Sequence, residues 1–210
     1  PTTYLGSRRP EAECVIIPST WREVGAGFYG SAGGFDYRAY IHSGLDGEQF
    51  AANGLRSGRQ KGNRAAADDM AGSVRVDYVG TPGLVVGGSV FLGNTGQDNL
   101  AGTMRIPDLT TTILEAHAEY QRGPVRMRAL YATALISNAG EFNAATGNNL
   151  GDRLESWYVD FGVDVFAAMD RDTAMTCTPF VRYESVDTQA SMPTGFTAQS
   201  QFDDDIITLG

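Results

Sequence analysis

Two kinds of residue that build catalytic and metal sites are scarce in this chain. Its 210 residues include only two cysteines, Cys14 and Cys177, and two histidines, His42 and His117. Two cysteines are too few for a disulfide scaffold and too far apart in sequence for a metal motif. They could pair in an oxidising compartment, and the sequence does not say whether they do. The histidines share no metal-ligand spacing, so we expect no metal site and no cofactor.

Long hydrophobic runs are also absent. No stretch approaches the ~18 consecutive apolar residues of a membrane-spanning helix. Strands of a β-barrel would escape this test, because polar residues that face the lumen dilute each strand. Glycine is instead abundant, at 26 residues, and aromatic residues make up 10% of the chain. Both suit strands that are joined by tight turns.

Positive charge is in deficit, with 16 Lys and Arg against 25 Asp and Glu and a net charge of -9. This balance argues against a nucleic-acid partner.

No serine lies in a nucleophile elbow and no Cys–His arrangement is suggested, so we do not expect an enzyme. Residues 25–30 (GAGFYG) match the dinucleotide pattern GxGxxG. That pattern needs a strand before it and a helix after it, whereas here it lies within an alternating strand.

The clearest pattern lies in residues 111–136, which read as two extended runs joined by a turn at residues 122–124. Polar and apolar residues alternate in both runs, and a period of two predicts a strand with one polar and one apolar face. Each run is about ten residues long, close to the ~9–11 residues with which a tilted strand crosses a bilayer. The predicted apolar face comprises Leu114, Ala116, Ala118, Tyr120, Val125, Met127, Ala129 and Tyr131.

Similar alternation recurs along the chain, and the connections between the runs alternate in length. Short turns are predicted near residues 31–34, 81–83, 122–124 and 170–172, and long connections near 43–71, 94–109, 137–155 and 187–204. Outer-membrane barrels sort their connections in this way, with short periplasmic turns and long external loops. We therefore predict an all-β fold: residues 1–210 form part of an antiparallel transmembrane β-barrel, with about eight strands and the start of a ninth.

An alternative fold and the strand register both bear on this prediction. A soluble, lipocalin-like antiparallel barrel would also show alternation, but it would point its large apolar residues inward. A register error of one residue would exchange the two faces of every strand. The chain starts at Pro1 without Met and ends in what reads as half a strand, so we expect a fragment of a longer protein whose other strands close the barrel.

Several segments resemble bacterial outer-membrane porins of the phosphate-selective O/P type. They are residues 16–23 (IIPSTWRE), 37–40 (YRAY), 44–45 (GL), 54–62 (GLRSGRQKG), 82–89 (PGLVVGGS) and 178–184 (TPFVRYE). The resemblance covers nearly the whole chain but consists of strand and loop patterns, with no catalytic fingerprint. It implies a barrel of roughly sixteen strands, usually a homotrimer, of which this chain would be the middle half.

The polar face of the strands would line the pore. Its predicted lining residues are Arg38, Arg75, Asp77, Glu115, Glu119, Arg126, Arg128, Asp160, Asp164, Arg182 and Glu184. Arginines in a narrow pore attract anions and match the geometry of phosphate. Interleaved charges of both signs, however, more often form an ion-paired wall that keeps the lumen wet, because their fields cancel.

The long basic connection is the sharper candidate for selectivity, with Arg56, Arg59, Lys61 and Arg64 within nine residues. Folded into the pore, it would form a constriction. The alternative is an exposed loop tip that meets solvent or acidic lipopolysaccharide.

The sequence thus predicts a porin of the bacterial outer membrane through which small hydrophilic solutes, or anions such as phosphate, diffuse. The alternative is a non-conducting binding or structural barrel of the same membrane.

Overall fold

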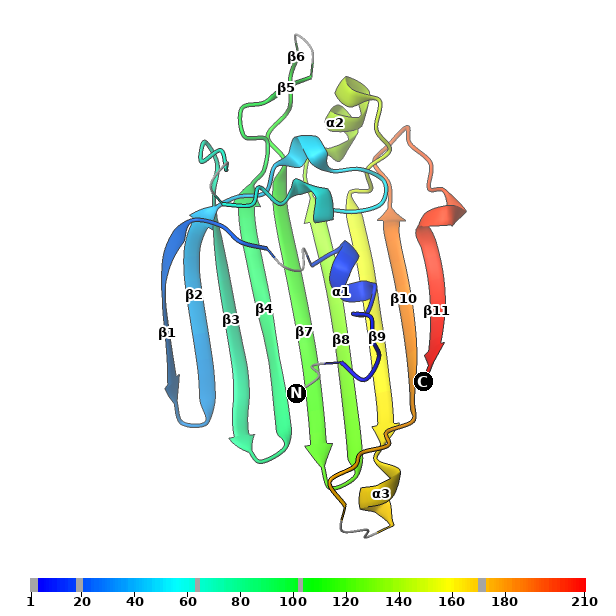
Figure 1. Ribbon diagram of the computed structural model, residues 1–210. Coiled ribbons are helices and arrows are strands. Elements are labelled where there is room, and N and C mark those ends of the chain that lie inside the picture. Colours follow the sequence, from blue (N-terminus) through cyan, green and yellow to red (C-terminus); the bar gives the residue numbers. More distant parts are fainter. Residues whose placement is uncertain (1–3, 18–20, 63–64, 102–103, 170–172) are drawn as a thin grey trace.

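Nine antiparallel strands form one continuous sheet in the computed structural model, which describes residues 4–17, 21–62, 65–101, 104–169 and 173–210 (Figure 1). Spatial order follows chain order, so each strand pairs with its neighbours in sequence. The strands are β1 (Gly25–Ala32), β2 (Phe35–Ser43), β3 (Met70–Thr81), β4 (Leu84–Asn94), β7 (Thr110–Arg122), β8 (Val125–Ile136), β9 (Arg153–Val163), β10 (Phe180–Ser191) and β11 (Asp203–Leu209).

The all-β prediction is therefore confirmed, with eight long strands and a shorter ninth, β11. Among the described residues β1 pairs only with β2 and β11 only with β10, so the sheet is open at both edges. The remaining elements are small: β5 (Leu100–Ala101), β6 (Met104–Arg105), α1 (Ala12–Val15), α2 (Ala139–Thr146), α3 (Val165–Ala168), η1 (Gly47–Gln49), η2 (Arg56–Gly58) and η3 (Ser200–Phe202). No helix in the described part of the chain has the length and apolar character needed to cross a membrane.

Three of the four connections at one end of the sheet are two-residue turns. They lie between β1 and β2, β3 and β4, and β7 and β8, where Gly33, Gly34, Gly83 and Gly123 have positive φ angles that glycine adopts without steric cost. The fourth connection, between β9 and β10, is longer than predicted because β9 ends at Val163 and α3 follows. The turn expected at residues 170–172 lies outside the described residues.

The two faces of the sheet differ sharply in polarity. The outer face exposes large apolar side chains along every strand, including Val90 (37% exposed), Leu114 (43%) and Val159 (38%). The other face, here called the covered face, carries charged and polar residues and lies behind α1 and the long loops (Figure 1). A water-soluble sheet protein places its apolar face inward. This sheet does the reverse.

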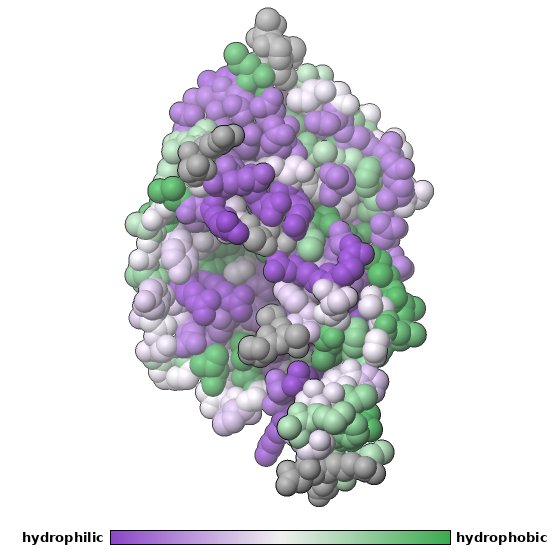
Figure 2. Space-filling model, in the orientation of Figure 1, coloured by the Kyte–Doolittle hydropathy of each residue, from purple (hydrophilic) through white to green (hydrophobic). Residues whose placement is uncertain are grey.

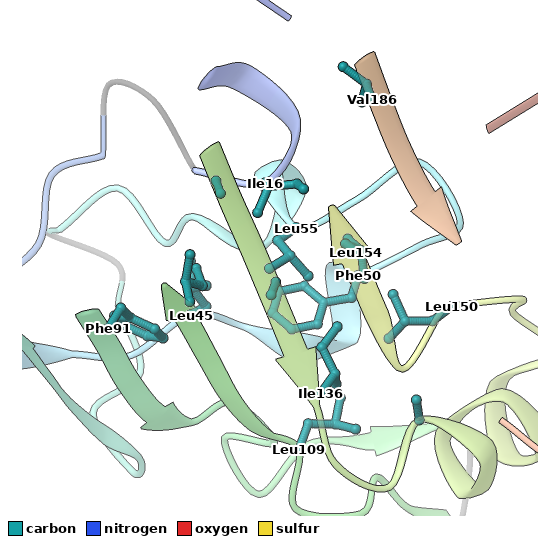
Figure 3. Packing of buried hydrophobic residues seen from close by; sticks show 14 of the residues in the cluster. Ile16, Leu45, Phe50, Leu55, Phe91, Leu109, Ile136, Leu150, Leu154 and Val186 are labelled. Carbon is teal, nitrogen blue, oxygen red and sulfur yellow. The ribbon is translucent and has the colours of Figure 1, made fainter. Parts of the chain in front are cut away.

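The buried hydrophobic side chains of the described residues form one cluster, much of which lies at the end of the sheet where the long loops fold back (Figure 3). Leu45, Phe50 and Leu55 of the loop between β2 and β3 are almost completely buried. They belong to one cluster with side chains of the strands and of the neighbouring loops, among them Leu109, Ile136, Leu150 and Leu154. This cluster fixes the loops over the sheet.

The structure also places the two cysteines and the GxGxxG match. Among the described residues, Cys14 and Cys177 form no disulfide. Residues 25–30, the GxGxxG match, lie within β1, where a Cβ at Gly25 or Gly27 would lie within 2.3 Å of a backbone oxygen of β2. Those glycines therefore serve close strand contact.

Candidate functional site

The covered face gathers ten of the eleven residues predicted to line a pore. The strand registers place these ten on one side of the sheet: Arg38, Arg75, Asp77, Glu115, Glu119, Arg126, Arg128, Asp160, Arg182 and Glu184. Asp164 does not belong to the set. It lies beyond the end of β9 and caps α3, where its carboxylate accepts hydrogen bonds from the backbone of Phe166 and Ala167. Aspartate is a preferred N-cap residue, which explains why the alternation stops there.

A ladder of alternating charges crosses this face. Glu119 of β7, Arg128 of β8, Asp160 of β9 and Arg182 of β10 stand directly opposite one another on successive strands. Arg128 bonds Glu119 at 2.9 Å, and Arg182 binds both oxygens of Asp160 at 2.5 and 3.0 Å. The Arg182–Asp160 pair is almost fully buried. Bidentate geometry suits a buried pair, and this part of the wall is charge-compensated.

The N-terminal segment, residues 4–17, lies against this ladder. Glu13 accepts hydrogen bonds from the hydroxyls of Tyr158 (2.5 Å) and Tyr4, and lies 3.7 Å from Arg128. The Tyr4 ring also packs against the Arg128 guanidinium, 4.8 Å from the ring centroid. Burial, together with the bond to Glu13, raises the pKa of Tyr4 to about 12.

Helix α1 is held by backbone contacts as well. The Glu184 carboxylate accepts hydrogen bonds from the backbone of Glu11 (2.6 Å) and Ala12 (3.3 Å). Arg182 donates to the backbone oxygen of Arg8, and Ser156 donates to that of Ala12. Residues 4–17 show no period of two in the sequence, so alternation alone does not identify this segment as a contact of the charged face. Ser156, Tyr158 and Asp160 lie two residues apart on one face of β9. Their polar groups were the signal in the sequence that another segment must supply hydrogen-bond partners at this face.

A second cluster lies on the β3–β4–β7 part of the face, away from α1. Glu115 accepts from Ser89 at 2.8 Å and lies 2.6 Å from Nδ1 of His117. Arg75 binds Asp77 at 2.8 Å, and both residues also reach Nε2 of His117. Asp77, Glu115 and His117 are each more than nine-tenths buried. His117 is not among the residues predicted to line the pore.

The long basic loop crosses the covered face from the β2–β3 side to β10. Thr188 of β10 donates to the backbone oxygen of Ala52, and the backbone N–H of Leu55 donates to the backbone oxygen of Val15, the last residue of α1 (3.2 Å). Arg56 and Arg59 are partly buried and Lys61 is exposed. Burial, with a contribution from Arg56, lowers the pKa of the Arg59 guanidinium, which stays charged in water. Arg64 lies outside the described residues.

Open space remains on this face. A cavity of about 230 Å³ separates the N-terminal segment from the turn ends of β4, β7 and β8, with Tyr4, Glu119, Arg126 and Arg128 in its lining. Figure 2 shows the same face hollowed beside the N-terminal segment and below the loop, with hydrophilic residues at its edge. Within the described residues, no group of three or more His, Cys, Asp or Glu side chains is placed to hold a metal ion.

Comparisons with known proteins are sparse. No family model matches the chain. A protein of Aquifex aeolicus (strain VF5), described as uncharacterized, is 28% identical over 222 residues, which cover all of this chain and 49% of that protein. The chain thus spans about half the length of the relative it matches.

Proposed function

We propose that this chain is part of an outer-membrane β-barrel channel, of the type of the phosphate-selective O/P porins, through which small hydrophilic solutes diffuse. The observation that carries this proposal is the reversed polarity of the sheet. Its exposed outer face is apolar and its covered face is charged, the arrangement that lipid outside and water inside require. Further strands would pair with the free edges of β1 and β11 and close the barrel.

Strand length supports the same proposal. Strands β3, β4, β7, β8, β9 and β10 have 11 to 13 residues each. A tilted strand needs ~9–11 residues to cross the hydrocarbon core. Soluble strands are nearer ~5–6 residues.

Solute selection would follow from charge and from the width of the lumen. In a closed barrel, the loop that crosses the covered face would narrow the lumen. Arg56 lines a pocket between this loop, α1 and β10, and Lys61 is exposed. Because the ladder on β7–β10 is charge-compensated, the loop is the better source of anion preference, for phosphate among other anions. A homotrimer in the outer membrane, in contact with lipopolysaccharide, is the assembly we propose by analogy with these porins.

A planar-bilayer recording of the full-length protein tests the channel. Stable conductance steps are expected. A protein that inserts into the bilayer without conducting would support the alternative, a non-conducting binding or structural barrel.

Neutralising the basic loop tests its role in selectivity. The combined Arg56→Ala, Arg59→Ala, Lys61→Ala and Arg64→Ala variant should move the reversal potential in a salt gradient toward cation selectivity, because positive charge leaves the pore. Lys61→Ala alone should give a smaller shift in the same direction. Arg105→Ala is the matched control, since Arg105 belongs to the separate β5–β6 hairpin and pairs with Asp98. An unchanged reversal potential would remove the loop from the conduction path.

A further inference from the structure

Large aromatic side chains lie on the covered face near the loop end of β1–β4. Tyr40 of β2 stands opposite Ser73 of β3, and Ser73 stands opposite Phe91 of β4, so the three share the face that carries Arg75. Trp21, which precedes β1, packs on this group, with its ring centroid 5.3 Å from that of Phe91. Aromatic girdles of a membrane barrel lie on its outer face. These rings lie on the opposite face, so a girdle does not explain them.

The rings border a pocket of about 370 Å³, a volume within the usual range of small-molecule sites. Trp21, Tyr40, His42 and Ser73 belong to its lining, and Tyr40 is 42% exposed. The Trp21 ring meets the rings of His42 and Phe91 at interplanar angles of 88° and 60°. Neither neighbour therefore stacks on the face of the indole. The pocket presents aromatic surface together with polar groups.

Glycines of β1 make room for this arrangement. A Cβ at Gly27 would lie 2.3 Å from Cδ1 of Tyr40, so the Tyr40 ring lies across bare backbone of β1. A Cβ at Gly25, which also lines the pocket, would lie 2.6 Å from Cβ of His42. The first two glycines of the GxGxxG match therefore leave this side of the pocket without side chains of β1.

The hydrogen bonds of His42 prepare Ser73 to act as an acceptor. The backbone oxygen of Ser43 can only accept, so Nδ1 of His42, 2.9 Å away, carries the proton of the neutral ring. Nε2 then accepts from the Ser73 hydroxyl at 3.2 Å. With its own proton directed to His42, the Ser73 oxygen is oriented to accept a hydrogen bond from a ligand hydroxyl.

The carboxylate in the lining, Glu23, is already engaged. Its Oε1 accepts from Nε1 of Trp21 at 2.6 Å and from the backbone of Gln60 at 3.0 Å, and its Oε2 accepts from the Ser43 hydroxyl at 2.9 Å. A cationic ligand would have to compete with these three donors. Glu23 instead holds the indole of Trp21 in the pocket wall. The lining therefore suits an uncharged ligand.

We propose that Trp21, Tyr40 and Ser73 form a binding site for neutral sugars in their ring form, on the wall of the channel. The inference rests on the proposed function, because the lumen is the route by which a sugar would reach this face. A pyranose ring has an apolar face of C–H groups that packs on aromatic rings, and a rim of hydroxyls that bond polar partners such as Ser73. An acyclic polyol has the hydroxyls without the rigid apolar face. The site therefore distinguishes the two kinds of solute.

The conductance of the full-length protein in a planar bilayer, titrated with D-glucose, tests the site. Glucose should reduce the conductance reversibly and to saturation, whereas sorbitol, its acyclic counterpart, should show no saturable effect. Trp21→Ala and Tyr40→Ala should each weaken the apparent affinity for glucose about tenfold, because an aromatic contact is lost. Trp157→Ala is the matched control, since Trp157 packs on Tyr183 at the outer face. Equal effects of glucose and sorbitol would overturn the proposal.

Trp21→Phe separates ligand contact from a purely structural role. This variant keeps an aromatic ring and loses the bond to Glu23, so it should retain most of the block by glucose. A loss as large as that in Trp21→Ala would assign Trp21 to loop packing alone and overturn the proposal.

Tryptophan fluorescence of the purified full-length protein in detergent gives a readout that needs no conductance. Glucose should change the emission of the wild type and of Trp157→Phe, and this change should disappear in Trp21→Phe. A wild type without a response to glucose, or a response that survives in Trp21→Phe, would overturn the sugar site even if channels form. A response at Trp21 in a protein that forms no channel would refute the proposed function and support the site.

Discussion

At the scale of single residues, the absence of a side chain matters as much as its presence. Gly87 of β4 lies opposite both Asp77 and His117. A Cβ there would lie 2.2 Å from Oδ1 of Asp77, 2.6 Å from the backbone oxygen of Val76 and 2.8 Å from Cε1 of His117. Glycine at this position is what lets the carboxylate and the ring meet across the intervening strand.

Gly87→Ala should therefore destabilise the sheet by about 1–3 kcal/mol, the usual cost of overpacking. Part of the obstruction is backbone, so side-chain rotation cannot relieve it. Gly72→Ala is the matched control: it lies on β3, where the nearest atom to an added Cβ is 3.8 Å away. Urea unfolding of both variants measures the difference. Equal stabilities would mean that the Asp77–His117 contact does not depend on Gly87.

At the scale of elements, the loop between β2 and β3 behaves as a strap that is tied at both ends. Near β2, Asp46 accepts hydrogen bonds from the backbone of Glu48 and the side chain of Asn99, and its own backbone donates to Gly58. At the far end, Thr188 holds Ala52. Phe50 and Leu55 fill the core below. These contacts hold the loop in place over the covered face, in contrast to a hinged lid.

The Asp46 anchor predicts a pH dependence of stability. Burial raises the pKa of Asp46 above its ordinary 3.8 despite the two hydrogen bonds. The folded state therefore holds this proton more tightly than the unfolded chain, and protonated Asp46 adds to the free energy of unfolding. This stabilisation is fully present below pH 3.8 and is lost as pH rises through the pKa that Asp46 has in the folded state. Asp46→Asn should become steadily more stable relative to wild type over that rise. Free energies of unfolding measured for both proteins at several pH values test this prediction. A difference between Asp46→Asn and wild type that does not change with pH would contradict it.

At the scale of the whole molecule, the sheet has two faces of opposite polarity. The charged face is covered by residues 4–17 and by the strap, and the apolar face is covered by no described residue. Exposed apolar side chains run across all the long strands, far beyond the patches of a typical soluble monomer. The proposed function places lipid on that face.

A charge on the outer face tests the environment directly. Val90 lies mid-strand on β4 beside Val74 and Leu114, and Leu135 lies near the loop end of β8. In a bilayer, Val90→Arg should cost about 2–4 kcal/mol and Leu135→Arg about 0–1 kcal/mol. On a soluble surface both would cost under about 0.5 kcal/mol. Unfolding from lipid vesicles measures the two values, and equal small costs would argue against a lipid-facing sheet.

The sequence by itself determined the strands, their order and the polarity of each face. These follow from a period of two, which is a local property of extended backbone and needs no knowledge of distant residues. Val90, Leu114 and Val159 on one face, and Arg75, Glu115 and Asp160 on the other, were predictable for that reason. Asp164 was misplaced because a helix cap interrupts the period at β9.

Only the tertiary structure decided what lies against the polar face. Glu184 meets the backbone of Ala12 across 172 residues of chain, and Thr188 meets Ala52 across 136. Arg75 and His117 are brought together through the registers of β3, β4 and β7. Such contacts leave no periodic trace, because a buried carboxylate can be satisfied by any donor that the fold delivers.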